Sequence, residues 1–120
     1  MKKRIISFNL SDENLTIITD GNTIKNVKFP LKIKQVEEFS DVLVVRLDVP
    51  ADILFNENVF GVSSEGKILW QIIPMKSGFK SSRYTGLFKK GDLVKVHNWD
   101  GTDLLLEPRT GEILKESYSK

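Results

Sequence analysis

The sequence predicts an all-β fold built from antiparallel meanders. Short segments rich in Ile, Val, Leu and Phe recur along the chain, whereas apolar residues at helical spacing rarely extend beyond two turns. Gly, Asn, Asp and Pro separate these segments, as is typical of turns. A compact β-sandwich or barrel is the alternative arrangement of the same strands.

The first half of the chain contains four expected strands, at residues 15–19, 23–29, 31–39 and 42–47. The first two join through Asp20-Gly21-Asn22, which is a strong signal for a tight hairpin. In the second of them, Ile24, Val27 and Phe29 are expected near one face because polar residues lie between them. These segments are rich in β-branched residues, which suit a pleated, half-buried surface.

The second half contains six more expected strands, at residues 59–63, 67–73, 86–88, 93–97, 103–106 and 112–117. Turn glycines lie between or beside them: Gly66, Gly91, Gly101 and Gly111. Glycine accepts the positive φ that such turns require. Residues 74–85 lack periodicity, so we expect a loop longer than usual for a compact domain, and such loops often carry function.

Length and composition favour one domain spanning residues 1–120, because 40% of the 120 residues are hydrophobic. The 18 basic and 16 acidic residues leave a net charge of +2, which makes long-range attraction to nucleic acid weak. The charged residues are mostly acidic in residues 37–65 and mostly basic in residues 76–95.

Cysteine is absent, which excludes disulfides and thiol chemistry. The basic opening lacks the apolar stretch of a secretion signal, so we expect a cytoplasmic protein and no membrane association.

Successive turn glycines at Gly21, Gly66 and Gly111 are 45 residues apart, which suggests an internal repeat. Residues 58–70 and 91–114 both contain a strand, a turn at glycine, one charged residue and an aliphatic pair. About half of the chain thereby resembles blades of the pyrroloquinoline-quinone-type β-propeller repeat, with Lys115 at the position where that repeat has Trp. The resemblance implies two to three blade-like meanders, and it implies no bound quinone because such sites need a complete ring.

Catalytic chemistry is not expected. His97 is the only histidine. The alternation of its strand places it on the same face as Lys95, opposite Val94 and Val96. With one His and no Cys, neither a metal site nor any other cofactor site is predicted. The alternative that includes catalysis is an enzyme that uses His97 with Asp100 or Asp103.

A small intracellular module that binds an acidic surface of another protein is the leading functional hypothesis, and an inhibitor or immunity-type protein would be one form of it. The expected contacts lie in the basic segment with interleaved aromatic residues, where Tyr and Arg are favoured interface anchors. They are Lys76, Phe79, Lys80, Arg83, Tyr84, Lys89 and Lys90. Single-stranded nucleic-acid binding through the same segment, and a homo-oligomer whose chains complete one ring, are the alternatives.

Overall fold

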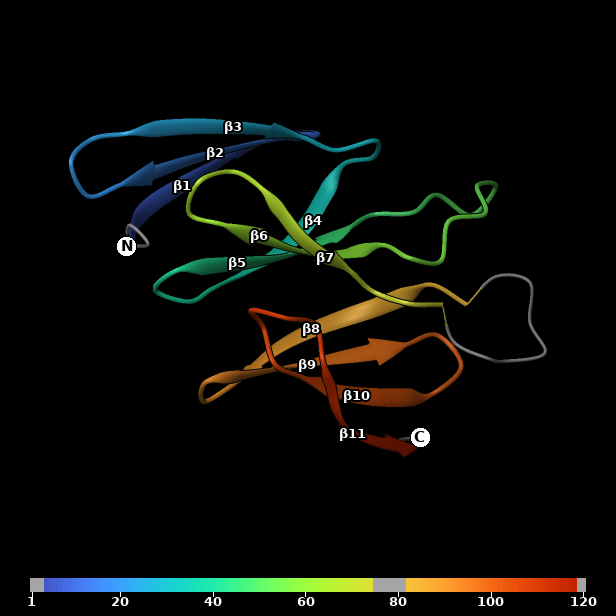
Figure 1. Ribbon diagram of the computed structural model, residues 1–120. Coiled ribbons are helices and arrows are strands. Elements are labelled where there is room, and N and C mark those ends of the chain that lie inside the picture. Colours follow the sequence, from blue (N-terminus) through green and yellow to red (C-terminus); the bar gives the residue numbers. More distant parts are fainter. Residues whose placement is uncertain (1–3, 75–81, 119–120) are drawn as a thin grey trace.

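Three antiparallel sheets form the structure, a computed structural model that describes residues 4–74 and 82–118 (Figure 1). The first sheet has the order β1-β2-β3, with β1 (Ile5–Ser11), β2 (Asn14–Thr19) and β3 (Ile24–Lys28). The middle sheet has the order β4-β5-β6-β7, with β4 (Ile33–Glu38), β5 (Val42–Leu47), β6 (Val59–Ser63) and β7 (Ile68–Gln71). The third sheet has the order β8-β9-β10-β11, with β8 (Tyr84–Lys90), β9 (Leu93–Asn98), β10 (Thr102–Leu106) and β11 (Ile113–Tyr118). The predicted antiparallel meanders are confirmed, and none of the three sheets closes into a barrel.

The three sheets are stacked in layers, so the middle sheet is covered on both faces (Figure 1). Alternate residues of β5 point to opposite faces, as the pleat of a strand requires. Val42 and Val44 pack against the third sheet, whereas Leu43, Val45 and Leu47 pack against the first sheet. Burial on both faces explains why β5 is a nearly continuous apolar run rather than an alternating one.

The two layers of core have different compositions. Between the first and middle sheets lie Ile5, Leu15, Ile17, Val27, Phe29, Leu43, Val45, Leu47, Phe60 and Val62. Between the middle and third sheets lie Phe39, Val42, Val44, Val59, Ile72, Tyr84, Leu87, Val94, Val96, Leu104 and Leu106. The phenol of Tyr84 is the only hydroxyl in either group, and it donates a hydrogen bond to the Ile73 carbonyl at 3.0 Å.

A buried asparagine connects the middle sheet to the third sheet. The Asn58 side chain donates hydrogen bonds to the carbonyls of Leu47 at 3.0 Å and Tyr84 at 2.9 Å, and it accepts one from the Tyr84 amide at 2.9 Å. The backbone carbonyl of Asn58 also accepts from the Leu47 amide. The end of β5 and the start of β8 are therefore held by one side chain.

The strand at the N-terminus was not expected from the sequence. Ser7, Asn9 and Ser11 interrupt the apolar pattern, but in β1 they lie opposite Ile18, Thr16 and Asn14 on the outer face of the first sheet. The expectation for Ile24 is also wrong. This side chain is 60% exposed, because an odd spacing separates it from the buried Val27 and Phe29.

The turn predictions are confirmed. Positive φ angles occur at Gly21, Gly66, Gly91, Gly101 and Gly111, which are the five glycines assigned to turns. In the first hairpin turn the Asn22 amide donates to the Thr19 carbonyl at 3.0 Å, so Asp20 and Gly21 are the central residues. Gly21 and the following Asn22 both have positive φ, and Asn is one of the residues that tolerates it. In the part of the chain that the structure describes, no helix has the length and apolar character needed to cross a bilayer.

Replacement of Asn58 is expected to destabilise the protein strongly. In Asn58→Ala, the buried amide and carbonyl of Tyr84 and the carbonyl of Leu47 lose their partners, which costs about 2–4 kcal/mol. Asn26→Ala is the matched control, because the Asn26 side chain is exposed and accepts one hydrogen bond from Thr16. Urea denaturation of both variants measures the difference. Equal destabilisation of the two variants would contradict the role of Asn58.

Stability is expected to fall at high pH because of Tyr84. Burial, together with the nearby Asp100 carboxylate, raises the pKa of this phenol. Above about pH 10 the unfolded state loses the Tyr84 proton while the folded state keeps it, so the unfolding free energy falls by up to about 1.4 kcal/mol per pH unit. Denaturation of the wild type and Tyr84→Phe over this range isolates the contribution. The variant should show a shallower decline, and identical slopes would refute the assignment.

Candidate interaction surface

The outer face of the third sheet carries lysine side chains around apolar and aromatic ones. Residues directly opposite each other in an antiparallel sheet share a face, so the strand register defines this surface. One row across the strands contains Gly86, His97, Asp103 and Ser117, and the next contains Phe88, Lys95, Leu105 and Lys115. Lys90 and Leu93 form a third pair. We call this surface, from Phe88 and Lys90 across to Lys115 and Ser117, the basic face.

A shallow hollow lies on the basic face. It has a volume of about 170 Å³ and is lined by Lys90, Lys95, Asp103, Leu105, Lys115 and Ser117. Three ammonium groups thus come from three different strands, β8, β9 and β11, around a floor that includes Leu105. Because the strands are hydrogen-bonded to each other, the backbone spacing of these lysines is fixed by the sheet.

An aromatic ring lies beside the lysines because glycine leaves room for it. A β-carbon added at Gly86 would lie 2.8 Å from Cε2 of Phe88, which places the Phe88 ring directly over the Gly86 backbone. The Lys95 ammonium is 5.3 Å from the centre of that ring, within the range of a cation–π interaction. The Phe88 side chain is 48% exposed. The preceding residue, Leu87, points to the opposite face of β8 and is fully buried in the core.

The basic face contains one acidic side chain among the described strand residues that point to it, and this acid is already paired. Asp103 Oδ1 lies 2.6 Å from His97 Nδ1. The carboxylate side chain is 10% exposed and the imidazole 34%, so Nδ1 is occupied while part of the ring meets solvent. The predicted placement of His97 with Lys95, opposite Val94 and Val96, is confirmed. Asp100 makes a different contact, because it accepts a hydrogen bond from the Thr102 amide.

The sequence-predicted contact residues are not gathered on one surface. Lys76, Phe79 and Lys80 lie outside the described residues. Arg83 donates hydrogen bonds to the carbonyls of Val49 and Pro50, which gives it a structural role.

The prediction for Tyr84 as an interface residue is wrong, because its side chain is fully buried and a partner cannot reach it. Lys89 points to the inner side of the third sheet, where it donates to the Glu38 carbonyl at 2.6 Å and lies over the Phe39 ring. Among the predicted contacts that the structure describes, only Lys90 lines the basic face.

Lys95 and Lys115 were absent from the predicted site. They are far apart in sequence, but β10 brings them together because Leu105 pairs with both. The alternation of β9 is the sequence pattern that indicates Lys95, because it places Lys95 and His97 on the face opposite the buried valines. The charge run between residues 76 and 95 predicts contacts in the loop and not on the face of the sheet.

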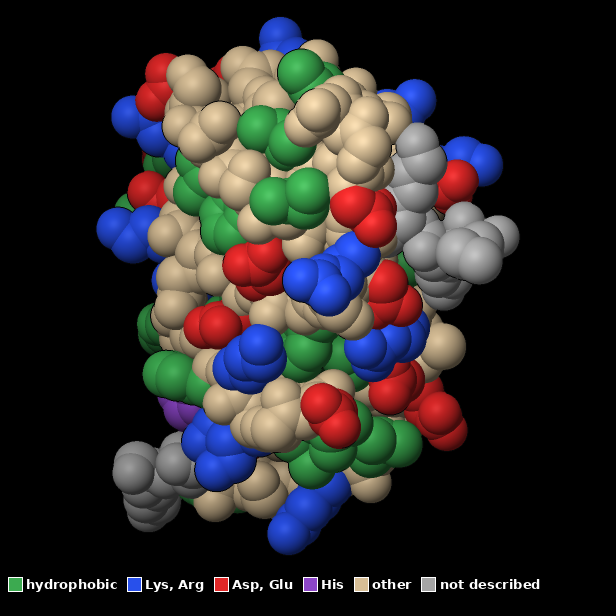
Figure 2. All heavy atoms as spheres, turned by 90° about the vertical axis from the view of Figure 1, so that its left-hand side faces the viewer, with side chains coloured by type: hydrophobic (Ala, Val, Ile, Leu, Met, Phe, Trp, Pro, Cys, Tyr) green, Lys and Arg blue, Asp and Glu red, His purple; other side chains and the backbone are tan. Residues whose placement is uncertain are grey.

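Charge is distributed differently on the side of the molecule seen in Figure 2. Acidic and basic side chains lie intermixed there, with hydrophobic side chains between them (Figure 2). Mixed charge of this kind is ordinary for a solvated surface. The basic face differs because its acid, Asp103, is hydrogen-bonded to His97 and is not paired with the lysines.

Fold and surface together define an all-β protein of stacked antiparallel meanders with a cationic outer face. Residues 5–118 match a family of domains of unknown function, DUF7957, and the chain belongs to this family. The comparison with curated proteins found no match. The match to this family does not test the resemblance to pyrroloquinoline-quinone-type blades, which remains a prediction.

A solved structure with a similar fold is the crystal structure of the computationally designed Ika8 protein. The TM-score is 0.57 and the sequence identity is 15%, so the likeness concerns the fold alone. It covers 97% of this chain and 37% of the designed chain. The chain therefore spans little more than a third of the length of the designed chain that it matches.

Adding a methyl group at Gly86 is expected to displace the Phe88 ring. In Gly86→Ala the new β-carbon would overlap the ring, and relieving such a clash costs about 1–3 kcal/mol. The ring current of Phe88 should shift the Gly86 Hα resonances upfield in the wild type, and Phe88→Leu should abolish this shift. Nuclear magnetic resonance (NMR) measures the shift, and denaturation measures the cost in Gly86→Ala. Unshifted Hα resonances in the wild type would disprove the stacked position of the ring.

Proposed function

We propose that the protein is a non-catalytic binding module that uses the basic face to hold an acidic surface of another protein. The observation that carries this proposal is the cluster of Lys90, Lys95 and Lys115 around Leu105, with the one acid of the cluster paired to His97. Inhibitors and immunity-type proteins are one form of such a module.

Electrostatic complementarity supports a specific partner more than a general attraction. The net charge is only +2, so long-range attraction to polyanions is weak. Three lysines on a rigid sheet nevertheless create a local positive potential that an acidic patch can match. Leu105 and the exposed ring of Phe88 add apolar area at the centre of the charges, where a partner would exclude water.

Single-stranded nucleic acid is the second candidate, because stacking rings beside cations are typical of its binding sites. The combination of Phe88 with Lys95 favours it. Such sites usually stack successive bases on several rings. Among the described strand residues that point to the basic face, only Phe88 has a benzene ring, and the imidazole of His97 is bonded to Asp103, which makes the protein partner the better match.

Reversing the three lysine charges is expected to abolish partner binding. We would compare capture from the native host's lysate by the wild type, by Lys90→Glu/Lys95→Glu/Lys115→Glu, and by Lys28→Glu/Lys32→Glu/Lys34→Glu. The control variant has the same change in net charge but leaves the basic face intact. The captured partner should be retained by the wild type and the control only. Calorimetry with the purified partner should then show at least about 100-fold weaker binding to the first variant.

Nuclease treatment and a salt series distinguish the two candidates. A protein partner should survive nuclease digestion, whereas nucleic-acid binding would be lost and would weaken steeply as salt rises. Retention of the partner by all three proteins would place the interface elsewhere and overturn the proposal.

A further inference from the structure

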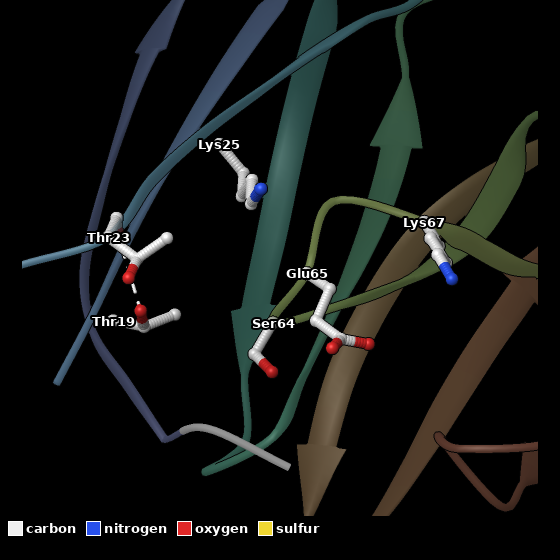
Figure 3. A pocket seen from close by; sticks show the side chains of 6 residues that line it. All are labelled: Thr19, Thr23, Lys25, Ser64, Glu65 and Lys67. Atoms are coloured by element: carbon white, nitrogen blue, oxygen red, sulfur yellow. Dashed lines mark hydrogen bonds between the residues drawn. The ribbon is translucent and has the colours of Figure 1, made fainter. Parts of the chain in front are cut away.

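A second site lies on the other side of the middle sheet, remote from the basic face. It is a pocket of about 260 Å³ between the β2–β3 hairpin and the β6–β7 hairpin. Its lining contains only polar and charged residues: Thr19, Thr23, Lys25, Ser64, Glu65 and Lys67 (Figure 3). A volume below the usual range for drug-sized ligands, which begins at about 300 Å³, suits a small molecule.

The walls of the pocket are held by the turn of the β6–β7 hairpin. The Ser63 hydroxyl accepts hydrogen bonds from the amides of Glu65 and Lys67, both at 3.2 Å. Gly66 lies against the opposite hairpin, because a β-carbon added there would be 3.1 Å from Cβ of Lys25. The two hairpins are therefore in contact beside the pocket, which gives the pocket a defined shape without a ligand.

A buried hydroxyl group opens into the pocket. Ser64 is 1% exposed, and its side chain makes no hydrogen bond to any residue that the structure describes. Buried polar groups nearly always have a hydrogen-bond partner, and this one can obtain it from a molecule in the pocket. Thr19, also 1% exposed, lies on the opposite wall and donates to the Thr23 carbonyl at 3.4 Å, so its oxygen can still accept.

Charged groups surround the hydroxyls. Lys25 belongs to the first sheet, whereas Glu65 and Lys67 belong to the opposite hairpin (Figure 3). Within the described ranges, none of the three forms an ion pair with another residue. Two ammonium groups favour an anionic group, and lysine is a common phosphate ligand. One carboxylate beside them is suited to accept hydrogen bonds from ligand hydroxyls.

We infer that this pocket binds a small phosphorylated polyol. In this arrangement Lys25 and Lys67 hold the phosphate, while Ser64, Thr19 and Glu65 meet the hydroxyl groups. A fully anionic ligand would be repelled by Glu65, and a neutral polyol would leave both lysines without a counter-charge. The assignment is independent of the proposed function, because the two sites share no residue.

An NMR titration of the full chain with glycerol 3-phosphate tests the inference. The amides of Thr19, Ser64 and Lys67 should shift and reach saturation. Lys67→Gln should weaken binding by about tenfold or more, because it removes a hydrogen bond to a charged group. Lys34→Gln, at an exposed position of β4 that lines neither site, is the control with the same loss of charge, and its affinity should equal that of the wild type. Ser64→Ala, which removes only the hydroxyl, should also weaken binding.

Parallel titrations with inorganic phosphate and with glycerol identify which part of the ligand matters. Both should bind more weakly than glycerol 3-phosphate if the two halves of the pocket act together. Absence of saturable shifts, or equal affinity of Lys67→Gln and Lys34→Gln, would overturn the site. Binding of inorganic phosphate as tight as that of glycerol 3-phosphate would overturn the polyol assignment and leave a simple anion site.

Discussion

Burial of the middle sheet on both faces is the constraint on which the other parts of the structure depend. β5 sends alternate side chains into two separate layers of core, so the first and third sheets are each packed against the same four strands. Asn58 adds hydrogen bonds at the end of this sheet, where apolar packing alone would leave the backbone of Tyr84 unpaired. A change in the middle sheet therefore affects both outer sheets.

This arrangement leaves the two outer faces of the stack free to differ. On the first sheet, a row of uncharged polar residues, Asn9, Thr16 and Asn26, crosses the three strands, and Thr16 donates to Asn26 at 2.9 Å. On the third sheet, the corresponding exposed positions carry Lys95 and Lys115. The hydrogen bond between Thr16 and Asn26 pairs two side chains of this row with each other, whereas the lysines of the basic face gain most from an external counter-charge.

Sequence patterns predicted the fold better than the surface. The bounds of β5 and β6 agree with the expected strands because dense β-branched runs end at clear turns. β1 was missed because Ser7 and Asn9 are outward-facing residues of an alternating strand, a pattern that looks like an interrupted apolar segment. Local chemistry determines strands and turns, so a single sequence contains most of that information.

The interaction surface depends on pairing between distant segments, which local patterns do not encode. Lys95 and Lys115 become neighbours only through the register of β10, and Tyr84 is buried because β8 packs its first residue beneath the sheet. Glycine illustrates the same limit. Gly86 resembles an ordinary strand glycine in sequence, yet its missing side chain allows Phe88 to lie beside the lysines. A lysine cluster on a strand face is therefore recognised from cross-strand register, and a charge run in sequence is a poor substitute for it.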